Sequence, residues 1–365
     1  RKHYEWALKR AAADQERLPE LEQRYRKNPK NRELKNQIRE IRGTLDSQAY
    51  AAAALYRYTG ESRYQDDLRR LCRVKTSEYP LIGFGAHPKT PKGESWNQEW
   101  AVWVYCLLDP NEKRYHGKVD IPLHERLTRA ACNWADFRVV NPAQKRSFRN
   151  GYEWTMPHVT GQETTPYVLP AMVAWKLSGD AKYLACCYWA ADYCLGGNPL
   201  NMCWVTQLGD RYPREVLHLD SQYDGIEEAV PGIVPYGPRR EGDRGTPWFD
   251  GPWDNDCGRN TAYPYHKQWP IAELWFENRY NPQGNEFTCS QNIAPSTAVY
   301  GFLCAPASGK FAPNKRPLVR ITKLSLKREG STPSVTITAE AQDPDGTVAE
   351  IEIFADHLKI GSIPK

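Results

Sequence analysis

The feature that most constrains the fold is a helical unit that occurs twice in the chain. In each copy an apolar helical stretch ends at a glycine, Gly60 or Gly179, and an acidic residue follows directly. A tyrosine stands four residues after the glycine, at Tyr64 and Tyr183. Glycine suits the left-handed position that ends a helix, and the residues after it can cap the next one. The two matching units predict stacked helical hairpins.

Helical periodicity covers most of residues 1–305 and gives way to loops between 196 and 270. We expect helices over 3–25, 32–42, 45–58, 97–108, 120–138 and 164–177, and further helices capped by Ser62 and Asp180. In 196–270 the residues Gly, Pro, Asp and aromatics dominate. A loop region this long within a compact domain is usually functional. Hairpins whose long loops gather at one end would form a toroid with a cleft there.

The C-terminal part of the chain has a different period. Residues 306–317 are rich in proline and predict a linker after a helical domain at 1–305. From 318 to 365 apolar residues alternate with polar ones, which predicts the first strands of a small β-sandwich that resembles a partial bacterial Ig-like module. The chain begins without Met and stops within a strand pattern, so we expect it to be part of a longer protein.

Charge and composition disfavour several classes of function. Residues 1–43, a charged helical hairpin, contain 13 Lys and Arg against 7 Asp and Glu, whereas the rest of the chain is nearly balanced. A solvated helix face explains this surplus better than nucleic-acid binding. No apolar run is long enough for a membrane span. The ten cysteines form no Cys-x-x-Cys pair, which disfavours a zinc cluster. The 13 Trp and 21 Tyr favour carbohydrate as a partner.

The residue that most directly suggests chemistry is Glu286. It lies nine residues after Glu277 and precedes the apolar helical run 293–303. A carboxyl group that is partly desolvated has a raised pKa and can hold a proton for a leaving oxygen. This is the general-acid half of a glycosidase mechanism. On local chemistry alone, a solvated carboxylate at the start of a helix is the competing interpretation.

The residues around Glu286 favour the general acid over the solvated carboxylate. From Trp275 to Asn292 the pattern resembles the acid signature of glycoside hydrolase family 9, the inverting cellulase-type enzymes. Glu286 falls on the proton donor of the family, Glu277 on its usual Asp, and Pro282 on an aromatic position. Two further blocks resemble the family in the same order: Asp192–Gly209, with its Gly-Asn-Pro and Val-Thr-x-x-Gly, and the stretch from Asp224 to Ile233.

The resemblance implies an (α/α)6 toroid that is incomplete at its N-terminus and needs no cofactor. It implies that Glu277 and Asn285 fix the acid and that His218 contacts the sugar. The family's His-x-Arg pair is represented by His218 with Asp220 in the place of the Arg. The family's base lies in an Asp-Ala-Gly-Asp motif, which this chain does not contain, so the resemblance assigns that base to a segment upstream of Arg1. A secreted or cell-surface location is also implied.

Other candidate residues precede the acid signature. The aromatic and histidine side chains of Trp253, Tyr263, Tyr265 and His266 are candidates for lining sugar subsites. Asp254 and Asp256 place oxygen ligands at alternate positions, as a calcium loop does, although a polar turn explains the same pattern. Trp96, Trp100 and Trp103 have helical spacing and are expected in the core.

The sequence leaves two functions open. The first is a glycosidase that cleaves a β-linked, β-1,4-glucan-like polysaccharide or oligosaccharide with inversion, with Glu286 as the general acid. The second is a non-catalytic carbohydrate-binding or extracellular assembly protein with the same fold. The absence of the His-x-Arg arginine and the basic helical hairpin at residues 1–43 favour the second alternative.

Overall fold

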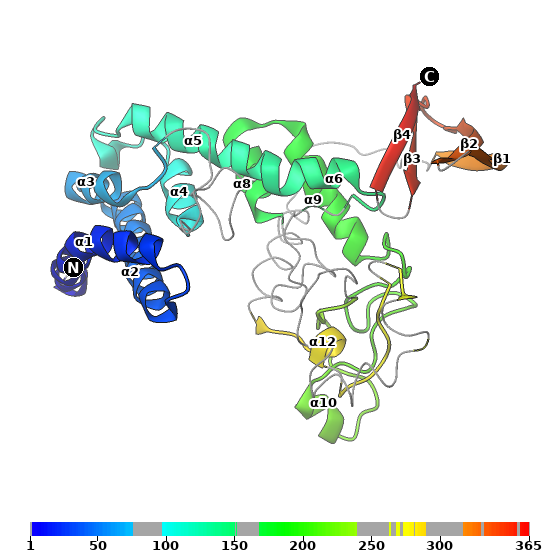
Figure 1. Cartoon of the computed structure of the whole chain (residues 1–365), viewed down its shortest axis with the longest axis horizontal. Coiled ribbons are helices and arrows are strands. Elements are labelled where there is room, and N and C mark those ends of the chain that lie inside the picture. The colour runs from blue at the N-terminus through cyan, green and yellow to red at the C-terminus, as the bar shows by residue number, and fades with distance from the viewer. Residues whose placement is uncertain are drawn as a thin grey trace.

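The computed structural model describes residues 2–75, 97–149, 151, 168–238, 263, 268–270, 273–280, 282–289, 317–329, 332–355 and 358–364. These residues are mainly helical, with antiparallel strands near the C-terminus (Figure 1). The helices are α1 (Lys2–Lys27), α2 (Arg32–Thr59), α3 (Ser62–Leu71), α4 (Glu99–Cys106), α5 (Ile121–Ala135), α6 (Asn141–Lys145), α8 (Leu169–Ser178), α9 (Ala181–Cys194), α10 (Leu219–Tyr223) and α12 (Pro282–Asn285). A 3-10 turn, η1 (Lys113–Tyr115), and a π-helical stretch, η2 (Asp136–Val140), complete the helical elements. None of the described helices is both long and apolar enough to cross a membrane.

Helices α1 to α9 pack as successive hairpins, which we call the helical body. Figure 1 shows them as an extended array, in which α2 packs against α1, α3 and α4, and α5, α8 and α9 continue the array. The two repeated units behave as predicted. Gly60 and Gly179 both end a helix in the left-handed conformation, each with φ 71°. Tyr64 and Tyr183 are both buried.

Two helix predictions were wrong in detail. The ranges 32–42 and 45–58 are one continuous helix, α2, that passes through Gly43. Leu34, Ile38, Ile41 and Leu45 share one buried face, and this packing outweighs the cost of about 1 kcal/mol for a glycine within a helix. The cap of α3 is also different from the prediction, because Ser62 is the first helical residue and not its N-cap.

Asp180 fulfils the capping role predicted for it, because its side chain accepts the N–H of Lys182 at 3.0 Å. The tryptophan prediction is only partly right. Trp103 is buried, but Trp100 is 47% exposed, because it lies on the outer face of the same helix. Trp96 lies outside the described residues.

The loops that follow α9 form a second part of the molecule. We call residues 195–238, 273–280 and 282–289 the site lobe. In Figure 1 it lies below the helical body and contains only two short helices, α10 and α12. Over 196–238 this confirms the predicted loss of long helices.

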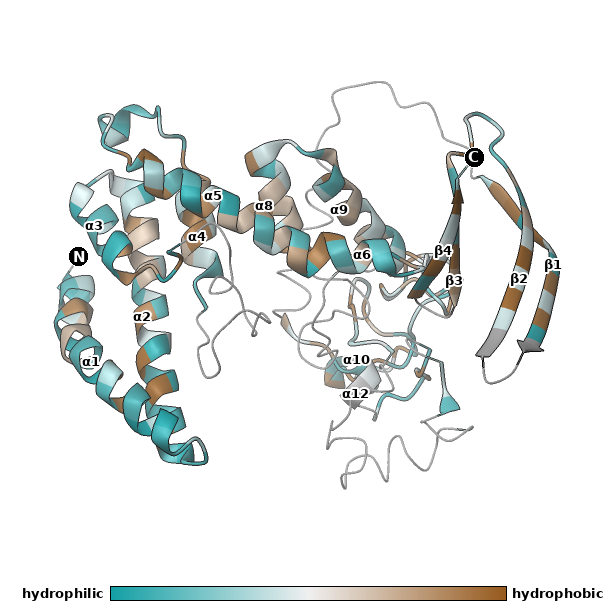
Figure 2. Ribbon diagram, turned by 45° about the horizontal axis from the view of Figure 1, so that its top comes forward, coloured by the Kyte–Doolittle hydropathy of each residue, from teal (hydrophilic) through white to brown (hydrophobic). Residues whose placement is uncertain are grey.

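Four strands follow, in two antiparallel pairs. They are β1 (Leu318–Glu329), β2 (Thr332–Gln342), β3 (Glu350–Ala355) and β4 (Leu358–Pro364). β1 pairs with β2 in the register Leu318 to Gln342, and β3 pairs with β4. Apolar residues along β1 and β2 are exposed, and Figure 2 shows them as brown bands on both strands. The strands confirm the predicted period of two, whereas the Ig-like assignment and the domain boundaries stay predictions.

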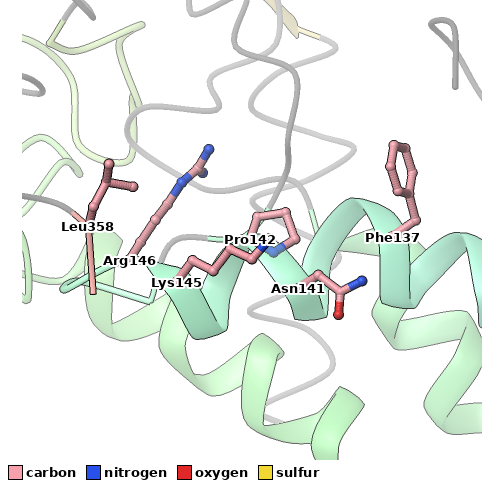
Figure 3. A pocket seen from close by; sticks show the side chains of 6 residues that line it. All are labelled: Phe137, Asn141, Pro142, Lys145, Arg146 and Leu358. Atoms are coloured by element: carbon pink, nitrogen blue, oxygen red, sulfur yellow. The ribbon is translucent and has the colours of Figure 1, made fainter. Parts of the chain in front are cut away.

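The β3–β4 hairpin docks on one end of the helical body. Arg149 forms an ion pair with Glu352, and its guanidinium lies 5.4 Å from the ring centre of Phe354 and 5.7 Å from that of Trp189. A β-bridge joins Arg146 to Leu358. A pocket of about 240 Å³ lies at this seam and is shown in Figure 3. Its lining residues are Phe137, Asn141, Pro142, Lys145, Arg146 and Leu358.

Candidate active site

The site lobe is tied to the end of α9 by one buried asparagine. Asn198 donates from Nδ2 to the carbonyl oxygens of Tyr193 and Met202, both at 2.7 Å. Its Oδ1 accepts the N–H groups of Leu200 and Met202 at 3.2 Å. The side chain therefore closes the turn after the helix with all its hydrogen-bonding capacity used. This explains why the Gly-Asn-Pro sequence stands where the helix ends.

Trp204 and Thr206 continue the loop from this turn and contact other segments of the site lobe. Trp204 is fully buried and packs edge-on against Trp275, with ring centres 5.1 Å apart. Thr206 Oγ1 donates to the carbonyl of Val230 at 2.6 Å and accepts the N–H of Ile233 at 2.9 Å. These contacts bring residues 204–206 next to both 230–233 and Trp275.

The main chain around Glu286 is held from two sides. On one side Leu217 N donates to the carbonyl of Asn285 at 2.8 Å. On the other side Tyr236 N donates to the carbonyl of Glu286, also at 2.8 Å. Gly237 N donates to the carbonyl of Gly284 at the same distance. Backbone hydrogen bonds from two separate loops thus fix the position from which the Glu286 side chain projects.

The carboxyl group of Glu286 lies in a mixed environment. The side chain is half-buried, and burial raises its pKa above the ordinary glutamate value. A hydrogen bond with the Tyr236 hydroxyl acts in the opposite direction and stabilises the carboxylate. The pKa is raised overall, which is the direction that favours a general acid.

His218 lies close to this acid. Its ring is 5.6 Å, centre to centre, from that of Phe287, the residue after Glu286. His218 also caps α10, because its Nδ1 accepts the N–H of Ser221 at 3.4 Å and lies 2.7 Å from the Ser221 hydroxyl. Since Nδ1 acts as an acceptor, the neutral ring carries its proton on Nε2. None of the described residues bonds that nitrogen.

Glu277 and Asn285, the two residues predicted to support the acid, form hydrogen bonds between segments of the site lobe. Glu277 accepts the N–H of Glu215 at 2.8 Å and that of Arg214 at 3.1 Å. The Glu215 side chain in turn accepts from Arg279 Nη2 at 2.7 Å. Asn285 is fully buried, and its Nδ2 donates to the carbonyl of Phe276 at 3.0 Å. Both side chains therefore bond main-chain atoms of the site lobe.

The remaining predicted residues are placed as follows. Tyr263 is 93% exposed. Trp253, Asp254, Asp256, Tyr265 and His266 lie outside the described residues. Tyr236 was not among the residues predicted from the sequence, although it follows the Pro-Gly block by only four residues. Its partner is fifty positions away in the chain, so no local spacing indicated it.

A second concave surface lies on the helical body. Its volume is about 550 Å³, and Asp46, Tyr50, Asn97 and Trp100 are among the residues that line it. Asp46 accepts the N–H of Asn97 at 2.7 Å, and burial raises its pKa to about 6. Tyr50 and Trp100 are each nearly half exposed. This surface combines a buried carboxyl with two accessible aromatic rings.

Comparison with known proteins places this arrangement in a family. The sequence model of glycosyl hydrolase family 9 matches residues 1–299, a range that includes the helical body and the site lobe. The chain belongs to this family. The resemblance drawn from the three sequence blocks is thereby confirmed.

Among family 9 relatives, a xyloglucan-specific endo-β-1,4-glucanase from Bacteroides ovatus is 25% identical over 196 residues, covering 52% of this chain and 30% of the relative. A thermostable endoglucanase from Alicyclobacillus acidocaldarius, solved as a single mutant, matches with TM-score 0.52 and 19% identity, over 72% of this chain and 43% of that one. Another family 9 endoglucanase matches with TM-score 0.53 and 18% identity, over 72% and 42%.

These likenesses confirm the predicted fold class. The helical hairpins of this chain correspond to part of the (α/α)6 toroid of family 9. The chain spans less than half the length of each of these relatives. Within the described residues, no group of three or more His, Cys, Asp or Glu is arranged to hold a metal ion.

Proposed function

We propose that this chain supplies the general acid of a glycoside hydrolase that cleaves a β-1,4-glucan-like polysaccharide. The observation that carries the proposal is the placement of Glu286, a half-buried carboxyl with raised pKa whose main chain is held from two sides. Its position within the matched family range supports the same role. Relatives named as endoglucanases and as a xyloglucan-specific endo-β-1,4-glucanase support the substrate class.

The chemistry proposed is a single displacement with inversion. Glu286 gives its proton to the glycosidic oxygen as the bond from that oxygen to the anomeric carbon breaks. A water molecule attacks the same carbon from the opposite face and gives its proton to a carboxylate base. In inverting enzymes the two carboxyl groups lie roughly 6.5 to 9.5 Å apart to leave room for this water. The family resemblance assigns the base to a motif that this sequence does not contain.

The other predicted residues have supporting roles in this proposal. His218 Nε2 donates to a sugar hydroxyl next to Glu286. Glu277 and Asn285 keep the surrounding loops in register through their bonds to main-chain atoms. The aromatic rings of Trp253, Tyr263 and Tyr265, with His266, line further subsites.

The test is Glu286→Gln in the natural protein that contains this chain. Glutamine has the same shape but no proton to give, so release of reducing ends from xyloglucan or mixed-linkage β-glucan should fall by at least roughly 10²-fold. The thermal unfolding midpoint should stay within a few degrees. Glu227→Gln, at an exposed glutamate of the same lobe, is the matched control and should keep full activity. Full activity in Glu286→Gln would contradict the proposal.

One observation favours a binding protein as a second candidate. The position two residues after His218, where the family has a substrate-binding arginine, is Asp220, an exposed acid in the first turn of α10. A protein that retains the fold but has lost a substrate contact would bind glucan without cleaving it. Calorimetric binding of xyloglucan oligosaccharides with no release of reducing ends would support this candidate over the glycosidase.

We also propose that the protein acts outside the cell, because polymeric glucans are found there. Fractionation of the producing cells would place it in the medium, at the surface or inside.

At Asp254 and Asp256 two interpretations stay open, a polar turn and a structural calcium site. A rise in thermal midpoint with added Ca²⁺ that is lost in Asp254→Asn would favour calcium. An unchanged midpoint would favour the turn.

A further inference from the structure

Tyr236 lies directly against the segment that contains Glu286. Its backbone N–H donates to the carbonyl of Glu286 at 2.8 Å, and the next residue, Gly237, makes the same bond to Gly284. Tyr236 is only 3% exposed, so a bound sugar could not reach much of it. The Tyr236 hydroxyl nevertheless contacts the half-buried carboxyl of Glu286, the group proposed to transfer a proton.

The side-chain contacts of Tyr236 form a short chain of hydrogen bonds. The Tyr236 hydroxyl bonds to the Glu286 carboxylate, and the Thr288 hydroxyl bonds to the phenol oxygen. Because a phenol has one proton, accepting from Thr288 leaves that proton for Glu286. A hydroxyl whose acceptor side is already occupied is fixed in direction as well as position.

We propose that Tyr236 is a positioning residue for the acid: its hydroxyl, oriented by Thr288, donates to the Glu286 carboxylate and selects one of its orientations. The contact itself is independent of any reaction, whereas its catalytic meaning rests on the proposed function. The hydroxyl also stabilises the carboxylate that remains once the proton has been transferred.

The contact makes a directional prediction for the proton affinity of Glu286. Burial raises the pKa of Glu286, and Tyr236 is the described side chain that lowers it. Two other titratable side chains of the site lobe have partners of their own. His218 is bound to Ser221, and Glu277 to the amides of residues 214 and 215. Removing the Tyr236 hydroxyl should therefore raise the pKa of Glu286 further.

The experiment is a titration of the protein labelled with ¹³C at glutamate side-chain carboxyls. Glu286→Gln identifies the signal of Glu286 by its disappearance. In Tyr236→Phe, which keeps the ring but lacks the hydroxyl, the Glu286 midpoint should rise by about one pH unit. Thr288→Val, which removes only the donor to the phenol, should raise it by less. It serves as the second test if the phenylalanine variant does not fold.

Tyr212→Phe is the matched control, because Tyr212 donates to another carboxylate of the same lobe, Glu228, at 2.8 Å. It should leave the Glu286 midpoint unchanged. An unchanged or lower midpoint in Tyr236→Phe would overturn the inference, as would a lower midpoint in Thr288→Val. A ring that served only for packing would produce no upward shift, since phenylalanine retains it.

Hydrolysis by the natural protein separates this inference from the proposed function. With an active enzyme, Tyr236→Phe should move the alkaline limb of the kcat profile upward by the same amount and lower kcat more than it changes KM. If Glu286→Gln retains activity, the proposed function fails while the titration still decides the contact. If Glu286→Gln is inactive and Tyr236→Phe shifts neither midpoint nor profile, only the positioning role fails.

Discussion

The helical body and the site lobe are held together by different interactions. In the helical body, side chains at helical spacing bury a continuous apolar core, which includes fully buried Tyr56, Leu45 and Trp134. In the site lobe the apolar clusters are small, and buried polar side chains such as Asn198 bond the main chain instead. Helices can thus provide a stable base, while hydrogen bonds from single residues determine where the acid lies.

This difference predicts different modes of failure. A change in the helical core acts on the cooperative unit and lowers global stability, whereas a change in the lobe opens a loop locally. The substitutions below test that division, beginning with the largest expected effect.

The largest effect is expected at one of the two glycines of the repeated unit. Gly60 and Gly179 have the same backbone conformation, φ 71°. A Cβ on Gly60 would lie 2.0 Å from the carbonyl oxygen of Arg114, but a Cβ on Gly179 would meet nothing within 4 Å. Gly179→Ala should cost about 1 kcal/mol for the left-handed conformation alone. Gly60→Ala should cost about 4 kcal/mol, because the chain must also move away from Arg114.

Denaturant unfolding of both variants checks this prediction, with each variant serving as the control for the other. Equal costs would mean that the two units are equivalent in packing as well as in sequence. They would then contradict the close approach of η1 to the end of α2.

A pH effect is expected next, and it belongs to the helical body. Glu99 is buried, accepts Trp134 Nε1 at 2.9 Å, and has its pKa raised to about 7 by burial, although this indole bond and Arg138 oppose the rise. The unfolded chain releases this proton near pH 4.5, whereas the folded chain keeps it. The contribution of Glu99 to stability should therefore be greatest below pH 4.5 and fall by about 3 kcal/mol as pH rises to 7.

Glu99→Gln keeps an acceptor for the indole and has no proton to lose. Its unfolding free energy should lack this fall between pH 4.5 and 7, apart from contributions of the same sign from Asp46, Glu277 and Glu286, whose pKa values are also raised by burial. Parallel pH profiles for the two proteins, measured by urea unfolding, would rule out Glu99 as the source.

The features that could be predicted from sequence are those with a local cause. The glycine caps, the period of the helices and the period of the strands depend on neighbouring residues, and all were found. Glu286 could be proposed as the acid because its motif is compact, and that role stays a prediction. The continuity of α2 was missed, because the cost of a glycine within a helix is outweighed only by packing against other helices, which the local sequence does not show.

The hydrogen bonds that connect the segments of the site lobe could not be predicted in the same way. Glu277 bonds amides 62 and 63 residues earlier in the chain, and no pattern in the sequence indicates such a partner. The contact between Tyr236 and Glu286 was missed for the same reason. Contacts of this kind depend on the path of the loops through space, which spacing along the sequence does not determine.

A local effect is expected at Asn198. Alanine removes two donors and one acceptor, and leaves buried carbonyls of Tyr193 and Met202 without these bonds. The loss should be about 2 kcal/mol and confined to the lobe. Hydrogen exchange should show faster exchange at residues 198–206 with no change in α2. Asn201→Gly, at an exposed residue with φ 50°, is the control and should behave like the natural protein. Faster exchange throughout α2 would contradict a local role.

The smallest effect is expected at Glu277, and it separates the two carboxyls of the acid signature. One oxygen, Oε2, receives the N–H groups of both Arg214 and Glu215. A glutamine carbonyl in that place can receive both, and burial raises the pKa of Glu277, so loss of its charge removes a desolvation cost. Glu277→Gln should change stability by less than about 1 kcal/mol at pH 7, whereas Glu277→Ala, which leaves both amides without an acceptor, should cost about 2 kcal/mol.

Hydrogen exchange at residues 214 and 215 checks this prediction, with Glu227→Gln as the control at an exposed site. Protection retained in Glu277→Gln and lost in Glu277→Ala would show that the residue acts as an acceptor and not as a charge. Equal loss in both variants would contradict this, because it would mean that the ionised form is required. At Glu286 the opposite is expected under the proposed function, because there the proton itself would be the reactant and glutamine cannot replace it.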